Sequence, residues 1–292
     1  MRITDAGAPD TRSTTSTCAG RPALPQGDTT WTVSTDGGAR TAIVHIPPGY
    51  SATSATPVVL NFHGYTESAS EEESLTLMDA ESDSAGFVVV YPQGTGALPS
   101  WNAGACCGTA VSENVDDIGF VNDLLDMLEA DLCVDTRRVF ATGMSNGGFF
   151  SQRLGCELAD RIAAIAPVAG VMGMPTCAPS RPMPVMEFHG TSDPIVPYDG
   201  DSLIGYASVA ATIAGWVARD ACQGAPQTTY SHGDATCVTY EHCTAGSEVT
   251  LCTITGGGHT WPGGTPLALL GKTSTDISAT DAMWGFFQTH AM

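Results

Sequence analysis

Residues 143–147 read GMSNG and match the pattern G-x-S-x-G, with an apolar segment before them and a helical segment after. In this pattern the serine lies at a sharp strand-to-helix turn, which exposes its hydroxyl at the carboxyl edge of a sheet. Gly147 and Gly148 provide the room that a close approach of strand and helix needs. The pattern therefore predicts that Ser145 is a nucleophile that attacks an acyl carbon.

A serine hydroxyl needs a base, and on such a sheet the chain order is serine, then acid, then histidine. The histidines after Ser145 are His232, His242, His259 and His290. We predict His259 as the base, because it lies in a glycine-dense loop at 255–264 directly after an apolar strand. The other three lie in polar stretches or beside the chain end, where surface roles are expected.

The acid is expected between the serine and the histidine, at the end of a strand. Asp193 follows the apolar segment 184–190 and precedes Pro194, which is typical of a strand exit. We therefore predict that Asp193 orients the imidazole, with Asp199 and Asp201 as alternatives.

Two backbone amides are expected to hold the oxyanion, one from Asn146 and one from Tyr65 in the loop after the segment 57–62. His63 is expected to shape this loop rather than to act as a base. Tyr65, Trp101 and Trp261 are candidates for contacting an aromatic or sugar ring of a substrate. The alternative for each tryptophan is that it pins its loop to the body of the protein.

The elements that must position these residues alternate between strand and helix along the chain. Short apolar runs predict buried strands, and 3.6-residue periodicity predicts helices. The expected strands are 57–64, 86–94, 138–145, 162–170 and 184–190, and the expected helices are 115–131, 146–156, 207–219 and 280–290. Strands 31–35 and 41–48 are expected to form an antiparallel hairpin around 36–38, and 237–243 and 248–257 a late strand pair.

This alternation indicates an α/β fold with a mostly parallel central sheet, helices on both faces and an antiparallel N-terminal hairpin. Residues 1–27 are rich in Thr, Ser, Gly and Pro and are interpreted as a flexible leader or linker. Residues 28–292 are interpreted as one catalytic domain, without repeats.

The charge is strongly acidic, with 31 Asp and Glu against 11 Lys and Arg in 292 residues and a net charge of -20. Such a field repels nucleic acid and anionic membranes, so neither is expected as a partner. No apolar run reaches the roughly 18 residues that span a bilayer. No C-x-x-C pair occurs, so we expect no metal, and we expect no cofactor. The protein is expected to be a monomer.

Ten cysteines indicate an oxidising, extracellular compartment. The first residues, MRITDAGAPD, contain no apolar signal region, so we expect that a signal peptide has already been removed. The proposed pairs are Cys237 with Cys252, Cys222 with Cys243, and Cys156 with Cys177. Cys133 is expected to pair with Cys106 or Cys107, which leaves Cys18 for the other; spacing alone cannot decide among pairings.

Seven ordered segments resemble the polyhydroxybutyrate-depolymerase-like esterases, a group that includes many feruloyl esterases. They read HGYTES at 63–68, VVVYPQG at 88–94, SWNAGACCG at 100–108, VDDIGF at 115–120, the run 143–170, EFHGTSDPIVPYDG at 187–200 and GGGHTWPGG at 256–264. The resemblance covers roughly residues 30–290. It implies an α/β-hydrolase fold, a secreted acyl esterase that needs no cofactor, and Ser145, Asp193 and His259 as its triad.

The expected function is therefore ester hydrolysis through an acyl-enzyme, with a feruloyl ester of plant cell-wall polysaccharide as the leading substrate. Tyr65 departs from the residue that polyhydroxybutyrate depolymerases often carry after the first His-Gly. Its setting also resembles cutinases, so hydroxyalkanoate and aromatic polyesters remain alternatives. Acyl transfer to a sugar is a further alternative, and a non-catalytic polymer-binding protein is the least favoured.

Overall fold

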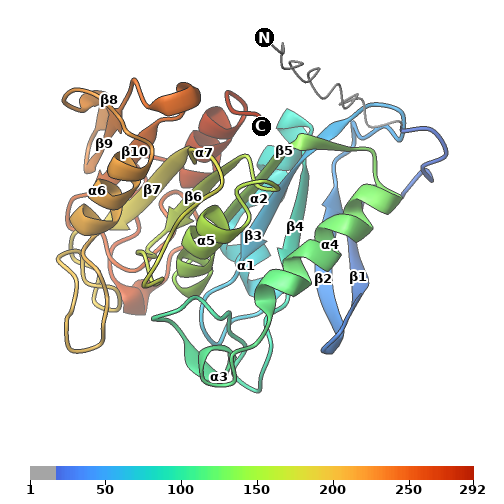
Figure 1. Ribbon diagram of the computed structural model, residues 1–292, viewed down its shortest axis with the longest axis horizontal. Helices are drawn as coiled ribbons and strands as arrows, with labels where there is room; N and C mark the ends of the chain where they lie inside the picture. The colour runs from blue at the N-terminus through green and yellow to red at the C-terminus, as the bar shows by residue number, and fades with distance from the viewer. Residues whose placement is uncertain (1–17) are drawn as a thin grey trace, which may run out of the picture.

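The computed structural model describes residues 18–292, and its first strands form the predicted antiparallel hairpin (Figure 1). Strands β1 (Gly27–Thr35) and β2 (Gly38–Ile46) pair along their whole length. Gly38 has a φ of 111°, a conformation that glycine adopts without a steric penalty. The turn residues therefore set the register of this hairpin, as the sequence predicted.

All described strands join one ten-stranded sheet in the order β1-β2-β4-β3-β5-β6-β7-β10-β9-β8. Six neighbouring strands in the middle of this order pair in parallel, namely β4, β3, β5, β6, β7 and β10. This confirms the predicted mostly parallel centre. Their bounds are β3 Thr56–Phe62, β4 Val88–Pro92, β5 Val134–Met144, β6 Ala164–Val168, β7 Val185–Gly190 and β10 Val249–Ile254.

Helices cover both faces of this sheet, as Figure 1 shows. One group packs on the face that carries α4, α5 and α6, and the other on the face that carries α1, α2 and α7. Their bounds are α1 Ala69–Thr76, α2 Met78–Ala85, α3 Gly108–Ser112, α4 Asp117–Asp131, α5 Asn146–Glu157, α6 Val209–Arg219 and α7 Ala279–Phe287.

The central strands divide the core into two layers, because successive side chains on a strand point to opposite faces. On β3, Val58 and Leu60 join the layer under α4 and α5, while Val59 joins the layer under α7. All seven residues of β3 are buried, since helices cover both sides. This explains why the central strands are continuous apolar runs rather than alternating ones.

The late antiparallel pair is also present, as β9 (Ala235–Tyr240) and β10, but it extends further than the sequence predicted. An additional edge strand, β8 (Gln227–His232), pairs with β9. Every residue of β8 is exposed, so it has none of the apolar run that marked the other strands. The short helices α1, α2 and α3 were not predicted, because none of them has a periodic apolar segment as long as those of the predicted helices.

The predicted leader at 1–27 falls partly outside the described residues. Its described part, residues 18–26, lacks helix and strand but is attached to the body of the protein. Cys18 forms a disulfide with Cys133, Arg21 donates to the carbonyl of Ala130, and Leu24 packs against the core. The proposed flexible linker therefore does not describe residues 18–26, because these contacts fasten them.

Five disulfides join all ten cysteines. Three predicted pairs are confirmed: Cys156 with Cys177, Cys222 with Cys243, and Cys237 with Cys252. The prediction for the other two was wrong, because Cys133 pairs with Cys18 and the adjacent Cys106 and Cys107 pair with each other. Cys133 lies at the amino end of β5, whereas the 100–108 loop is bonded to Asn146, beyond the carboxyl end of this strand.

None of the helices within residues 18–292 combines the length and the apolar composition that crossing a bilayer requires.

Candidate active site

Ser145 lies at the turn between β5 and α5, as its motif predicted. Its backbone has φ 56° and ψ −120°, a strained conformation for a residue with a side chain. The amide of Ser145 donates to the carbonyl of Val168 on β6, at 2.9 Å, and this bond holds the turn. Ser145 is partly exposed while its neighbours in 141–150 are buried, so the turn presents this one side chain outward.

Gly147 permits the close approach of α5 to the sheet. A Cβ atom on Gly147 would lie 1.8 Å from the carbonyl oxygen of Phe62, which is far inside contact distance. Gly148 is similarly constrained, with a Cβ position 2.7 Å from the carbonyl oxygen of Val168. Backbone atoms on both sides leave no room for a side chain, as the sequence analysis expected.

Asp193 and His259 lie together at the carboxyl edge of the same sheet. The Nδ1 atom of His259 is 2.7 Å from Oδ2 of Asp193, and both residues are buried. The other carboxylate oxygen, Oδ1, accepts from the amides of Ile195 and Val196, each at 2.8 Å. Burial opposes the charge of Asp193, but these hydrogen bonds outweigh it and lower the pKa of the carboxyl.

The same edge of the sheet carries the three candidate triad residues. Ser145 follows β5, Asp193 follows β7, and His259 follows β10. These three strands are parallel: β7 pairs directly with β10, and β6 alone lies between β5 and β7. The alternatives Asp199 and Asp201 do not reach the imidazole among the described contacts; the carboxylate of Asp201 accepts the amide of Leu203 instead. The geometry therefore favours Asp193 as the partner of His259.

The loop after β3 lies directly against Ser145. A Cβ atom on Gly64 would lie 3.4 Å from the Cβ of Ser145. The amide of Thr66 donates to Pro99, and that of Gly64 to the carboxylate of Glu67. Within residues 18–292, no protein acceptor takes the amides of Tyr65 or Asn146. These two N–H groups can therefore donate to a ligand oxygen, which is what an oxyanion hole requires.

His63 shapes this loop in the way the sequence suggested. The amide of Gly94 donates to its Nε2 at 2.9 Å, so Nδ1 carries the proton and donates to the carbonyl of Gly64 at 2.7 Å. Burial is the main cause that lowers the pKa of His63 to about 4. The ring therefore stays neutral and acts as a fixed brace between two loops.

Glu67 is a carboxyl of the candidate site that was not predicted from the sequence. Its Oε2 accepts the Gly64 amide at 2.9 Å. Burial raises the pKa of Glu67, while the Gly64 hydrogen bond and the nearby His259 act in the opposite direction. The available signal was an acidic residue three positions after Gly64, a spacing at which a side chain can accept a turn amide.

The 100–108 loop is fastened to the nucleophile helix through Asn146. The side chain of Asn146 accepts from the Trp101 amide at 2.7 Å and donates to the Trp101 carbonyl at 3.0 Å. Asp117, at the start of α4, accepts the Asn102 amide at 2.7 Å and pairs with Arg40. The Sγ atom of Cys106 lies 3.6 Å from the side-chain nitrogen Nδ2 of Asn146. The loop is thus a rigid wall beside Ser145.

The predicted substrate contacts of Trp101 and Trp261 are not supported, because both side chains are fully buried. Trp101 stacks on Phe150 and donates its indole N–H to the carbonyl of His63 at 3.1 Å. Trp261 donates to the hydroxyl of Thr280 at 3.0 Å. Each tryptophan pins its loop to the body, which was the alternative interpretation. Tyr65 is 38% exposed, so it alone of the three offers a ring surface to a ligand.

A pocket of about 230 Å³ lies between α1 and the loop that follows His259. Glu67 and Glu71 form its polar side, and Leu75 and Leu267 its apolar side. Glu67 also accepts the amide of Gly64, so this pocket shares one side chain with the loop after β3.

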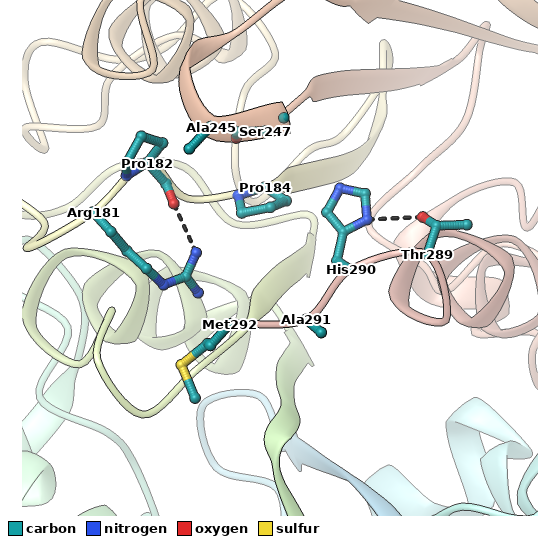
Figure 2. Close-up of a pocket in the computed structure, with 10 residues that line it drawn as sticks. Arg181, Pro182, Pro184, Ala245, Ser247, Thr289, His290, Ala291 and Met292 are labelled. Carbon is teal, nitrogen blue, oxygen red and sulfur yellow. Dashed lines mark hydrogen bonds between the residues drawn. The ribbon is translucent and has the colours of Figure 1, made fainter. Parts of the chain in front are cut away.

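A pocket of about 300 Å³ lies at the opposite edge, near the amino ends of β7 and β10 (Figure 2). Figure 2 shows Arg181 donating to the carbonyl of Pro182, and His290 bonded through Nδ1 to the hydroxyl of Thr289. Burial and Arg181 lower the pKa of His290 to about 4. Ser247 in this pocket donates its hydroxyl to Asp220, so it forms no nucleophile–base pair with His290.

Residues 41–218 match the family model described as esterase PHB depolymerase. Feruloyl esterase B of Piromyces equi is 34% identical over 234 residues, which cover 75% of this chain and 42% of that protein. Feruloyl esterase D of Neurospora crassa is 27% identical over 250 residues, which cover 83% of this chain and 81% of that protein. The chain thus spans less than half the length of the first relative.

Among solved structures, an acetyl xylan esterase from Aspergillus awamori superimposes with a TM-score of 0.64 at 15% identity. The match covers 89% of this chain and 99% of that chain. At this identity the likeness concerns the fold, which is the α/β-hydrolase fold expected from the sequence.

Proposed function

The chain belongs to the PHB depolymerase family of esterases, and from this premise we propose that it hydrolyses carboxylic esters through an acyl-enzyme on Ser145. The observation that carries the proposal is the 2.7 Å contact of His259 with Asp193, at the sheet edge where the β5–α5 turn presents Ser145. A nucleophile, a base and an orienting acid are the parts that acyl transfer needs.

In this mechanism the Ser145 hydroxyl attacks the ester carbonyl while His259 takes its proton. Asp193 holds the imidazole with its proton on Nδ1, which leaves Nε2 free to act as the base. The amides of Tyr65 and Asn146 receive the negative charge that develops on the carbonyl oxygen. His259 then protonates the leaving alcohol, and water releases the acid by the same steps in reverse order.

We expect Ser145→Ala to lower turnover of 4-nitrophenyl acetate by roughly six orders of magnitude, because the acyl-enzyme can no longer form. The exposed Ser54→Ala, on the loop before β3, is the matched control and should retain full activity. A folded Ser145→Ala protein that hydrolyses the ester at a rate near wild type would refute the assignment. Labelling of Ser145 by a fluorophosphonate provides an independent check.

We further propose that the preferred substrate is a feruloyl or similar aromatic acyl ester on a plant polysaccharide. Feruloyl esterases are among the relatives, and the exposed ring of Tyr65, the residue after Gly64, offers a surface for an aromatic acyl group. Polyester cleavage is the second candidate, favoured by the family description. Acyl transfer to a sugar acceptor is a third candidate, which a product analysis separates from hydrolysis.

A comparison of methyl ferulate, polyhydroxybutyrate film and an aromatic polyester film distinguishes these candidates. The proposal expects methyl ferulate to be hydrolysed with the highest kcat/KM. Faster release of soluble products from either film would transfer the assignment to a polyesterase. Formation of a sugar ester in the presence of abundant xylo-oligosaccharide would favour the transferase.

We also propose that the protein works outside the cell as a monomer. Five disulfides persist best in an oxidising compartment. Intact mass before and after reduction tests their presence in the natural secretion product, and light scattering tests the oligomeric state.

A further inference from the structure

Two ionisable residues lie buried directly behind Asp193, on the strand that leads to it. Glu187 and His189 are two positions apart on β7, so their side chains point to the same face of the sheet. Both side chains are fully buried. The proposed ester hydrolysis gives neither of them a role in contacting substrate, and burying such groups is costly unless they are paired.

The contacts of these two side chains form a chain that ends at the candidate triad. Nδ1 of His189 lies 3.5 Å from Oε1 of Glu187. Nε2 of His189 lies 2.9 Å from the carbonyl oxygen of Val196 and 3.7 Å from Oδ2 of Asp193. That same Oδ2 atom contacts Nδ1 of His259.

The partners of His189 determine where its protons lie. A carbonyl oxygen only accepts, so Nε2 carries a proton that it donates to Val196. Nδ1 of His189 and Oε1 of Glu187 have no other hydrogen-bond partner among the described residues. They face each other, so one proton between them satisfies both atoms.

The surrounding charges favour placing that proton on the ring. Burial opposes the charged ring, but the hydrogen bond and charge of Glu187, with the Val196 carbonyl and Asp193, raise the pKa of His189. Burial raises the pKa of Glu187, partly offset by His189 and by Gln152. Tyr198 packs edge-on against the ring, and His259 lies beyond Asp193.

Glu187 is itself held in place by the helices on this face. Gln152 of α5 donates to Oε2 of Glu187 at 3.1 Å, and Trp216 of α6 donates to the Gln152 oxygen at 2.6 Å. An indole N–H can only donate, so it fixes which end of the Gln152 amide faces Glu187. The helix that begins at the nucleophile therefore also orients the pair behind the acid.

We propose that Glu187 and His189 form a buried, protonated pair that positions Asp193 and tunes the proton affinity of the triad. His189 is a positioning residue, because it acts through Asp193 and does not touch the substrate. The charges then alternate from the core to the sheet edge: Glu187 is negative, His189 is positive and Asp193 is negative. The proposal rests on the proposed function for its effect on catalysis, although the protonation of the pair does not.

The sign of the effect on catalysis follows from the charge of His189. A cation behind Asp193 repels a second positive charge at the end of the same chain. The enzyme then stays active further into the acid range. Removing the cation should therefore move the acid limb of the kcat/KM profile to higher pH.

His189→Gln tests this, because the amide can still donate to Val196 but carries no charge. We expect its acid limb, measured with 4-nitrophenyl acetate, to move up by about 0.5–1 pH unit. Glu187→Gln should move the limb in the same direction. His290→Gln, which alters a buried histidine at the opposite edge, is the control and should leave the limb in place.

The double variant Glu187→Gln/His189→Gln covers the case in which a single variant fails to fold, since two amides can bond to each other. Its shift should equal that of His189→Gln alone, because residues that act as one unit are not additive. Folded variants whose acid limb coincides with wild type would overturn the proposal, even if their activity is lower, since a purely structural role predicts that result.

Nitrogen-15 NMR of histidine-labelled protein tests the pair without relying on catalysis. At pH 7 we expect protons on both ring nitrogens of His189 in the wild type, and loss of the Nδ1 proton in Glu187→Gln. A wild-type His189 without a proton on Nδ1 at this pH contradicts the proposal. If the protein hydrolyses none of the esters, the proposed function fails while this measurement still decides the state of the pair.

Discussion

At the scale of single residues, backbone space beside Ser145 is tightly constrained at Gly147. Gly147 lies where any Cβ atom would overlap the carbonyl oxygen of Phe62, the last residue of β3. That same strand end leads into the loop that carries Gly64 and Tyr65. The geometry of Ser145 and of the Tyr65 amide therefore depends on one close contact between two backbones.

We predict that Gly147→Ala lowers the free energy of unfolding by about 3 kcal/mol or more, because relief of the overlap must displace either α5 or β3. Thermal unfolding and esterase activity should both fall. Gly285→Ala in α7 is the matched control, since a Cβ there meets nothing within 4 Å. It should stabilise the helix by up to about 1 kcal/mol. Equal unfolding temperatures for the two variants would contradict the argument.

At the scale of elements, the helices α1 and α2 meet the N-terminal hairpin through a group of acidic side chains. His45 of β2 contacts Asp28 at 2.6 Å and Asp83 at 3.0 Å. Burial opposes the charged ring, but these hydrogen bonds raise the pKa of His45. Burial, followed by the charges of Asp79 and Asp28, raises the pKa of Glu73 to about 7.

Because the pKa values of His45 and Glu73 are both raised, the contact between the hairpin and these two helices becomes less stable as the pH rises. A carboxyl whose pKa rises from 4.5 to about 7 on folding binds an extra proton in the folded state across that interval. Stability therefore falls as the pH rises through it. A raised histidine pKa has the same sign, since its stabilising charge is present below its unfolded pKa and lost as the pH rises through the folded pKa.

We predict that Glu73→Gln raises the melting temperature at pH 8 and leaves it nearly unchanged at pH 5, where the glutamate is already protonated. Differential scanning calorimetry at both pH values measures this. The exposed Glu113→Gln removes the same charge elsewhere and controls for the general repulsion of a chain with net charge -20. An equal gain for both variants at pH 8 would show that the acidic contact has no special role.

At the scale of the whole molecule, the disulfides differ most in the length of chain that they close. Cys18–Cys133 spans 115 residues and attaches the N-terminal segment beside β5, whereas Cys106–Cys107 joins neighbours. In the loop-entropy account, stabilisation grows with the length of the closed loop.

We predict that Cys18→Ala/Cys133→Ala lowers the free energy of unfolding by about 2–5 kcal/mol, as measured by denaturant titration. The Cys106–Cys107 disulfide closes no comparable loop, so Cys106→Ala/Cys107→Ala should change stability much less, although it alters the 100–108 loop beside Asn146. A greater loss of stability from the second pair would contradict the entropic explanation.

Local patterns in the sequence were sufficient for the turn around Ser145, the parallel central strands, the hairpin and three disulfides. Small residues, uninterrupted apolar runs and cysteine separations of 15 to 21 residues are properties of short stretches of chain. Chain order also singled out Asp193 and His259, which the fold brings to 2.7 Å.

The tertiary structure decided whatever depends on distances between remote segments. It buried Trp101 and Trp261, paired Cys18 with Cys133, and placed Glu187 and His189 behind Asp193. Burial and pairing of this kind arise only when helices cover a sheet and loops meet at its edges. A residue's type and neighbours carry no record of which distant backbone will lie against it.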